Sequence, residues 1–323
     1  MIWALFFLLI AVLLALDLGL LHRKAREVTF KAALGWSLVW IAIGLSFSVV
    51  VYGVYEHHWF GAELGSKTPI SGTEAVLLYL TSYLVEESLS VDNLFVIAVI
   101  FRSFSVEGQY RYRVLFWGIM GALVMRAMMI AGGVWMISQF TWMFYVFGSY
   151  LAFMGIKLLR GGDEDPDVET TFFVRMSRRF LPLANGPHGG HFLVEEDNRT
   201  KLTMLGLVLL VVEGTDVIFA LDSIPAVLAI STDPFIVYTS NIFAILGLRS
   251  LYFVLAGMVD RFKYLKTALS GILIFIGAKM LLHSVVKIPT PVSLAAIAVM
   301  LTLGVVVSQY AARDESLDDE GRA

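Results

Sequence analysis

Long apolar blocks follow one another through almost the whole chain. A helix needs about 20 consecutive apolar residues to cross the hydrocarbon layer of a bilayer, and the chain offers nine such blocks. They fall at residues 2–21, 34–55, 73–101, 113–136, 142–159, 202–230, 236–258, 265–283 and 290–310. Because every backbone polar group must be satisfied within the bilayer, we predict an all-α, polytopic membrane protein with about nine transmembrane helices.

The composition agrees with lipid as the solvent of this protein. Of the 323 residues, 58% are hydrophobic and 16% are charged, whereas ordinary soluble domains have about 25% charged residues. There is no cysteine, which excludes disulfides, thiolate metal sites and cysteine nucleophiles. The net charge of −3 gives no indication of nucleic-acid binding. We therefore expect the lipid bilayer as a partner and no nucleic acid, while a homo-oligomer stays open.

The basic residues between the blocks predict the orientation of the chain, because Lys and Arg concentrate in cytoplasmic loops. Eighteen of the 24 Lys and Arg residues fall on one side if the N-terminus lies outside and the C-terminus inside. Only Lys67 and Lys287 fall in the opposite loops. The largest cytoplasmic loop then spans residues 161–201. Its two histidines, His188 and His191, fit an ordinary Gly-rich turn better than a metal site.

Three consecutive blocks recur later in the chain. Three pairs of segments align, with offsets of 130, 123 and 122 residues: 86–92 with 216–222, 117–126 with 240–249, and 155–157 with 277–279. The first pair places Glu86 on Asp216. It also places Asp92 on Asp222. The chain is therefore expected to contain two copies of one three-helix unit.

This repeat defines the organisation of a single membrane domain, residues 1–323. We expect two N-terminal scaffold helices, the first repeat, a cytoplasmic loop, the second repeat, and a last helix with a cytoplasmic tail, at residues 1–72, 73–160, 161–201, 202–284 and 285–323. Since each copy has three spans, an odd number, the two copies face opposite ways across the membrane. Inverted repeats build many secondary transporters, with the substrate site at the midplane between the copies.

Five acidic residues lie near the middle of the repeated blocks: Glu86, Asp92, Glu213, Asp216 and Asp222. A carboxylate at the centre of a transmembrane helix costs about 2.5–3.5 kcal/mol on the insertion scale, so acids in this position mark functional sites. Ligand sets made only of oxygen suit hard or borderline cations such as Mg²⁺, Ca²⁺ and Mn²⁺. We predict that these five residues bind a divalent cation.

Further polar residues accompany the five acids. Four are secondary metal or gating candidates: Asn93, Ser223, Asn241 and Glu87. Glu87 ranks below Glu86 because it has no acidic counterpart in the second repeat. The sixth block also contains Gly214 and Pro225, which weaken or interrupt a helix. We therefore expect the third and sixth blocks to form broken helices near their acids, as in many transporters.

Two arginines offer a purely structural alternative. Arg126 and Arg249 lie in the middle of repeated blocks and correspond to each other in the repeat. They are charge partners that could neutralise the acids in buried ion pairs, which often stabilise no more than packed apolar residues. Five acids against two arginines leave an excess of negative charge, and a bound cation would remove it.

Three motifs carry a resemblance to a known family: Glu86-x5-Asp92-Asn93, Glu213-x2-Asp216-x5-Asp222-Ser223-Ile224-Pro225, and the run from Thr232 to Arg249. On these motifs the chain resembles the TerC family of membrane proteins over roughly residues 5–310, and its two extra N-terminal spans resemble the Alx branch of that family. The resemblance implies a nine-span fold and export of Mn²⁺ from the bacterial cytoplasm across the inner membrane. It also implies that the intramembrane acids are metal ligands.

These features together predict a secondary transporter that works by alternating access, with Mn²⁺ as the transported ion and proton exchange as the coupling hypothesis. No enzymatic activity and no permanently bound cofactor are expected. The residues alone do not separate Mn²⁺ from Ca²⁺ or Mg²⁺. They also leave open a proton or monovalent-cation antiporter and a non-transporting stress sensor or scaffold. An intramembrane aspartyl protease would use two aspartates on membrane helices. This class is disfavoured, because none of the membrane aspartates Asp92, Asp216 and Asp222 lies in a Gly-x-Gly-Asp stretch.

Overall fold

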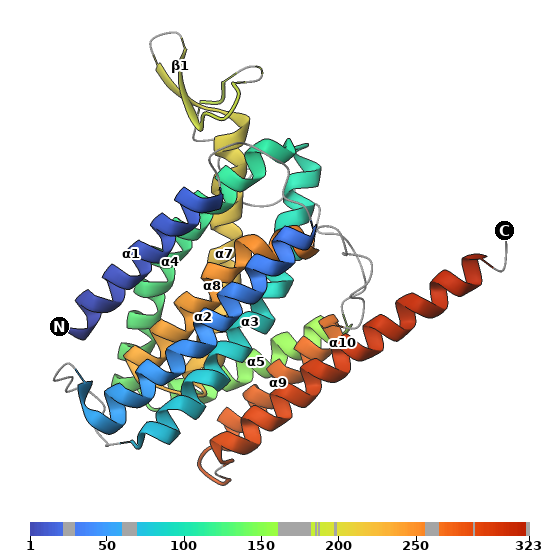
Figure 1. Ribbon diagram of the computed structural model, residues 1–323. Helices are drawn as coiled ribbons and strands as arrows, with labels where there is room; N and C mark the ends of the chain where they lie inside the picture. Colours follow the sequence, from blue (N-terminus) through green and yellow to red (C-terminus); the bar gives the residue numbers. More distant parts are fainter. Residues whose placement is uncertain are drawn as a thin grey trace.

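Nine helices and one β-hairpin make up the part of the chain that the structure describes. The computed structural model describes residues 1–21, 30–59, 70–160, 182–184, 186, 188–196, 199–255, 265–286 and 288–320. The helices are α1 (Ile2–Leu21), α2 (Phe30–His57), α3 (Gly72–Ser103), α4 (Gly108–Gln139), α5 (Met143–Arg160), α7 (Met204–Leu228), α8 (Pro234–Leu255), α9 (Leu265–Leu281) and α10 (Thr290–Glu320), and they form one bundle (Figure 1). Each of the nine apolar blocks corresponds to one of these helices.

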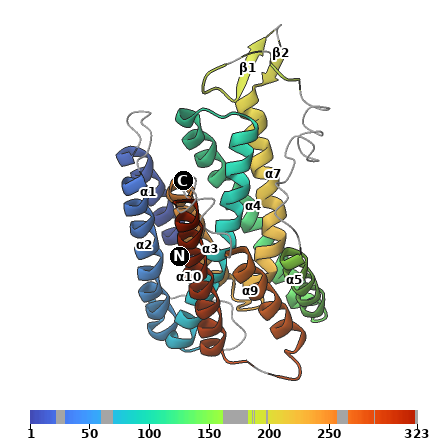
Figure 2. The same ribbon diagram turned by 90° about the vertical axis from the view of Figure 1, so that its right-hand side faces the viewer.

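A β-hairpin departs from the all-α prediction. Strands β1 (Leu193–Glu196) and β2 (Arg199–Leu202) pair antiparallel, with Leu193 opposite Leu202. The hairpin projects from one end of the bundle and leads directly into α7 (Figure 2). It begins in the predicted loop 161–201 and ends one residue beyond it, at Leu202. Residues 161–181, 185, 187, 197 and 198 of that loop lie outside the described part of the chain. The loop therefore contains ordered β-structure that the distribution of charge did not predict.

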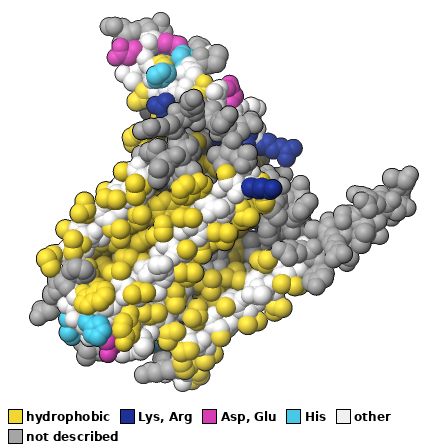
Figure 3. Space-filling model, in the orientation of Figure 1, with side chains coloured by type: hydrophobic (Ala, Val, Ile, Leu, Met, Phe, Trp, Pro, Cys, Tyr) yellow, Lys and Arg dark blue, Asp and Glu magenta, His cyan; other side chains and the backbone are white. Residues whose placement is uncertain are grey.

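The surface of the bundle is that of a membrane protein. Hydrophobic side chains cover the sides of the visible face, and the charged side chains seen on it gather at the ends (Figure 3). Five helices, α2, α4, α7, α8 and the Thr290–Ser308 part of α10, are long and apolar enough to cross a membrane. Helix α3 has 32 residues and is long enough to cross a membrane, but it contains more charged residues than these five helices have in their apolar stretches, among them Glu86 and Glu87. Nine crossings therefore stay a prediction.

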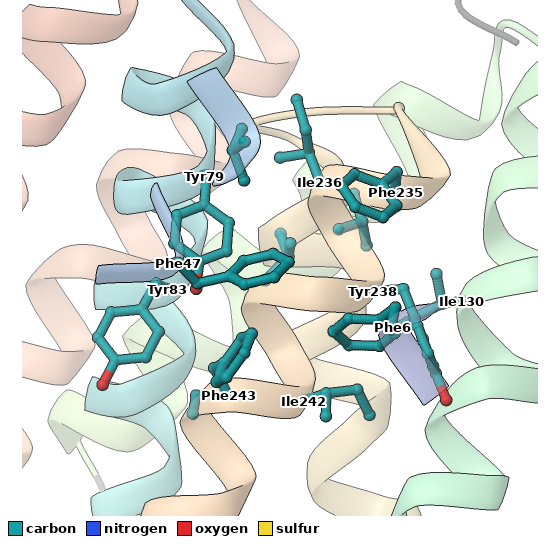
Figure 4. Close-up of a cluster of buried hydrophobic side chains, with 14 of the residues drawn as sticks. Phe6, Phe47, Tyr79, Tyr83, Ile130, Phe235, Ile236, Tyr238, Ile242 and Phe243 are labelled. Carbon is teal, nitrogen blue, oxygen red and sulfur yellow. The ribbon is translucent and has the colours of Figure 1, made fainter. Parts of the chain in front are cut away.

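An aromatic cluster fastens the N-terminal helices to the rest of the bundle. Phe6 of α1 and Phe47 of α2 pack around Phe243 of α8, and the ring centroids of Phe47 and Phe243 are 4.6 Å apart (Figure 4). Beside them, the hydroxyl of Tyr79 on α3 donates a hydrogen bond of 2.8 Å to the carbonyl oxygen of Gly44 on α2. These contacts hold α1 and α2 against α8 and α3, and the scaffold role of the two helices stays a prediction.

Helices α5 and α9 approach closely at glycine residues, where a side chain would not fit. A Cβ atom on Gly155 would lie 2.8 Å from the carbonyl oxygen of Ser270, and one on Gly277 would lie 2.7 Å from the carbonyl oxygen of Gly148. Adding 122 to the residue numbers 155 and 148 gives 277 and 270, so the offset of the sequence repeat converts one contact into the other. The later residue of each helix meets the earlier residue of its partner, so the two helices run antiparallel.

The other contacts between helices of the two repeats also occur in corresponding pairs. Helix α3 packs on α8, and its counterpart α7 packs on α4, the counterpart of α8. Helix α3 also contacts α7, and α4 contacts α8. The four helices α3, α4, α7 and α8 thus enclose a common interior, in which the candidate site lies.

The glycine contact between α5 and α9 gives the first test. We expect Gly277→Ala to destabilise the protein by about 1–3 kcal/mol, because overpacking a close contact forces the backbones apart. The measurement is thermal unfolding in detergent. Gly132 of α4 is the matched control, since no atom lies within 4 Å of a Cβ built there. Gly132→Ala should keep or raise the stability, by up to about 1 kcal/mol, and equal losses in both variants would contradict the interpretation.

Candidate functional site

Polar caps start two of the helices that bear the acids. The Ser71 hydroxyl accepts a hydrogen bond from the backbone N–H of Glu74 at the start of α3, 3.2 Å away. The Thr203 hydroxyl accepts one from the N–H of Gly206 at the start of α7, at 3.0 Å. Such caps satisfy backbone donors that a helix leaves unpaired at its first turn. They fix where the helices begin and therefore which faces carry the acids.

The helices α3 and α7 are continuous, which corrects the expectation that they are broken. Helix α7 runs through Gly214 without interruption, and Pro225 lies in its last turn. A proline this near the end of a helix removes one backbone hydrogen bond, toward Leu221, and the chain ends the helix soon afterwards. The acids are therefore presented by regular helical backbone.

Arg126 of α4 is the centre of the site and is wholly buried. It forms an ion pair with Glu86 of α3 through Nη1. Its Nη2 lies 3.1 Å from Oδ1 of Asp216 on α7, and its Nε lies 3.4 Å from Oδ2 of the same carboxylate. The guanidinium thus contacts both oxygens of Asp216, a bidentate arrangement that fixes the geometry of the pair. The ion pairs join one helix of the first repeat to one of the second through Arg126.

Neutral oxygens complete the surroundings of Arg126. Its Nη1 also donates to the Ser223 hydroxyl at 3.5 Å and to Oδ1 of Asn241, on α8, at 3.3 Å. Ser90, one helical turn after Glu86, places its hydroxyl 3.4 Å from the Glu86 carboxylate. Four of the predicted candidates, Glu86, Asp216, Ser223 and Asn241, therefore do converge, and they converge on a guanidinium.

Glu213 lies beside this cluster, against a position that has no side chain. A Cβ on Gly121 of α4 would overlap its carboxylate. Its Oε2 is buried and has no hydrogen-bond partner among the described residues. Oε2 of Glu86 and Nδ2 of Asn241 are unpartnered in the same sense. Buried polar atoms are normally hydrogen-bonded, so the site retains binding capacity that Arg126 does not use.

The other predicted residues lie apart from Arg126 or are less fully described. Asp222, half-buried, accepts a hydrogen bond of 2.6 Å from the hydroxyl of Tyr150 on α5. Glu87 faces α8, where a Cβ on Gly247 would lie 3.9 Å from its Oε1. Asn93 is buried in α3. Asp92 lies in the same helix, but its side chain falls outside the described part of the structure.

Arg249, the counterpart of Arg126 in the sequence repeat, contacts a tyrosine of α4. Its Nη1 donates a hydrogen bond of 2.6 Å to the hydroxyl of Tyr112, and its Cζ lies 4.4 Å from the centroid of the same ring. The repeat in the sequence did not predict this contact. Tyr112 did not stand out in the sequence, since aromatic residues are common near the ends of membrane helices, and no sequence signal singled out Tyr150 in the middle of α5. Ser90 could have been found from its i, i+4 spacing to Glu86.

The acids do not form a closed metal cage in this conformation. Among the side chains that the structure describes, no three Asp, Glu or His groups are placed to hold a metal ion together. The cluster instead combines two ion-paired carboxylates, a third carboxylate beside them, and neutral oxygens. Chemically, such a set binds cations through oxygen.

The hairpin carries a separate polar cluster at the end of the bundle. His188 Nε2 lies 2.9 Å from one oxygen of Glu196, and Lys201 Nζ lies 3.1 Å from the other. Hydrogen bonds from Lys201 and His188 lower the pKa of Glu196 below its usual value of 4.5. His188, in the segment before β1, therefore contacts the first strand of the hairpin.

Comparison with known proteins gives a consistent family. Residues 71–316 match the model of the integral membrane protein TerC family. An uncharacterised membrane protein of Myxococcus xanthus is 46% identical over 319 residues, which cover 98% of this chain and 95% of that protein. A protein of Escherichia coli K12 that is named as a candidate membrane-bound redox modulator, Alx, is 41% identical over 311 residues, covering 96% and 94%. No solved structure matches.

The Glu196 contacts predict a pH dependence. Because the folded pKa is lowered, the contacts stabilise the hairpin above the ordinary carboxyl pKa of 4.5 and are lost as the pH falls through the lower folded value. Carboxyl ¹³C NMR of labelled protein should place the Glu196 midpoint below 4.5, and Lys201→Met should raise it. A midpoint that Lys201→Met leaves unchanged would argue against this contact.

Proposed function

The chain belongs to the TerC family of integral membrane proteins, and on that premise we propose that it is a secondary transporter of the bacterial inner membrane that exports a divalent cation from the cytoplasm, Mn²⁺ before Ca²⁺ or Mg²⁺. The proposed protein has nine spans, with its N-terminus outside and its C-terminus inside. Its cargo is a metal ion, and it holds no permanent cofactor.

The observation that carries this proposal is the cluster of Glu86, wholly buried, with Asp216 and Glu213, partly buried, in the interior of the bundle. Ionisable groups inside a membrane protein are expensive and mark ion pathways. Glu86 is wholly buried, yet one of its oxygens has no partner among the described residues, and the same holds for Glu213 Oε2. Carboxylate, hydroxyl and amide oxygens are the ligands that hard divalent cations prefer.

The contact between α5 and α9 supports the inverted repeat on which alternating access depends. Two antiparallel helices that exchange equivalent contacts, Gly155 on Ser270 and Gly277 on Gly148, have the arrangement that a twofold axis across their length would produce. Copies related in this way have opposite orientations in a membrane. The concentration of 18 basic residues on one side supports the same topology.

Export of a divalent cation requires a coupled driving force. Moving one charge against an inside-negative potential costs about 2.3 kcal/mol per 100 mV, so two charges cost about 4.6 kcal/mol per 100 mV. Carboxylates bind either a metal ion or protons at the same oxygens. We therefore propose that the site releases the cation outward as it takes up protons.

A redox role is the second candidate, because the relative from Escherichia coli carries a name of that kind. This chain has no cysteine, so thiol–disulfide chemistry is closed to its own residues. A protein that moves Mn²⁺ can influence redox balance through the ion. A proton or monovalent-cation antiporter and a stress sensor or scaffold are distinguished by the transport test.

The transport test compares cellular manganese in a Mn²⁺-sensitive bacterial host. We expect the wild type to lower it, and Asp222→Asn or Glu213→Gln to slow export by about tenfold or more, as lost metal contacts do. Glu74→Gln is the matched control, because Glu74 is an exposed acid of the first turn of α3. Membrane expression is checked for each variant. Unchanged manganese with the wild type would remove the Mn²⁺ claim, and equal lowering by all variants would make these acids structural.

Proton exchange predicts that transport depends on pH. In proteoliposomes with Mn²⁺ inside, export driven by protons entering from outside should accelerate as the external pH is lowered at fixed internal pH, because protons compete with the metal for the same oxygens. Mn²⁺ efflux is followed with a fluorescent indicator. A rate that stays flat between about pH 6 and pH 9 would count against exchange with protons, since metal binding to carboxylates is pH-dependent.

A further inference from the structure

The Arg126 guanidinium occupies the point where the proposed cation ligands converge. Its Nη1 faces oxygens of Glu86, Ser223 and Asn241, while Nη2 and Nε face Asp216. These oxygens come from three helices, α3, α7 and α8, and the guanidinium comes from a fourth, α4. A cation held by a buried, all-oxygen set is the chemistry proposed for the cargo, and here the chain itself supplies the cation.

A guanidinium and a divalent ion cannot share these oxygens. Arg remains charged under all physiological conditions, so it cannot make room by losing a proton. Two cations in a dry interior repel strongly at the short separations that shared ligands would impose. The side chain is also wholly buried. Occupation of Glu86 and Asp216 by the cargo therefore requires the guanidinium to leave them.

The site is not saturated by Arg126, which is an independent sign that another ligand binds here. Oε2 of Glu86 belongs to a wholly buried residue and has no partner among the described residues. Oε2 of Glu213, one helical turn before Asp216, is also buried and unpartnered, although the residue as a whole is only partly buried. A purely structural ion pair would be expected to satisfy all its buried polar atoms.

From this geometry we infer that Arg126 is a tethered competitor of the cargo. This inference rests on the proposed function. In the state described here the guanidinium neutralises Glu86 and Asp216. The cargo binds by displacing the guanidinium, and return of the guanidinium expels the cargo. In a carrier of this kind Glu86 and Asp216 always have a cation beside them, either the guanidinium or the cargo.

The inference predicts that removal of the competitor tightens metal binding. Purified protein in zwitterionic nanodiscs is titrated with Mn²⁺ and the free ion is measured by electron paramagnetic resonance. Arg126→Gln should lower the Kd at least about tenfold, or 1.4 kcal/mol, and should slow Mn²⁺ release from proteoliposomes. Arg126→Lys keeps a tethered cation and should stay closer to the wild type. Arg113→Gln is the matched control, because Arg113 is on the same helix but packs on the ring of Phe192.

A structural role for Arg126 predicts the opposite result. If Arg126→Gln folds, as judged by thermal unfolding, and binds Mn²⁺ no more tightly than the wild type, the inference is overturned. If Arg126→Gln does not fold, Asp216→Asn is compared with the double variant Asp216→Asn/Arg126→Gln, which removes both members of the pair. Recovery of Mn²⁺ affinity in the double variant supports competition, and absence of recovery overturns it.

The two proposals fail differently. A wild-type protein that neither binds nor transports Mn²⁺, Ca²⁺ or Mg²⁺ removes the proposed function and the role of Arg126 together. A wild-type protein that transports the ion, with an unchanged Kd in folded Arg126→Gln, removes only the role of Arg126.

Discussion

The buried ion pairs of Arg126 are the interaction on which the interior of this protein depends. A charged side chain inside a bundle of membrane helices is not solvated by water, so its desolvation cost must be offset by a partner of opposite charge. Here one guanidinium serves Glu86 and Asp216, which belong to different repeats. Removal of one partner from a buried pair typically costs about 3–5 kcal/mol, because the remaining charge is left uncompensated. The same electrostatic contact that links the repeats therefore also restricts how far they can separate.

The positions of the helices could be predicted from the sequence because lipid imposes a direct relation between apolar length and structure. Each apolar block corresponds to a helix, from α1 at Ile2–Leu21 to α10. The hairpin could not be predicted in this way. Its strands have four residues each, and the pairing of Leu193 with Leu202 depends on a turn and on neighbouring segments, with no apolar run to signal it.

Several members of the cluster around Arg126 were among the residues that the sequence singled out, but their geometry was not predictable. The internal repeat identified Glu86 and Asp216 as equivalent acids, and the structure brings them to one arginine. The repeat also made Arg126 and Arg249 equivalent, but Arg249 binds Tyr112. Alignment treats two copies as identical, whereas the partner of a side chain depends on how the copies pack. The continuity of α7 at Pro225 was missed for a different reason. A proline in the last turn of a helix removes only one backbone hydrogen bond, so the helix is not broken there.

The contact between α5 and α9 has a consequence for variation in the chain. It is self-complementary, like the isologous interface of a twofold dimer. Gly155 and Gly277 each face the backbone of the opposite helix, so neither can acquire a side chain alone without cost, and the two positions are constrained together.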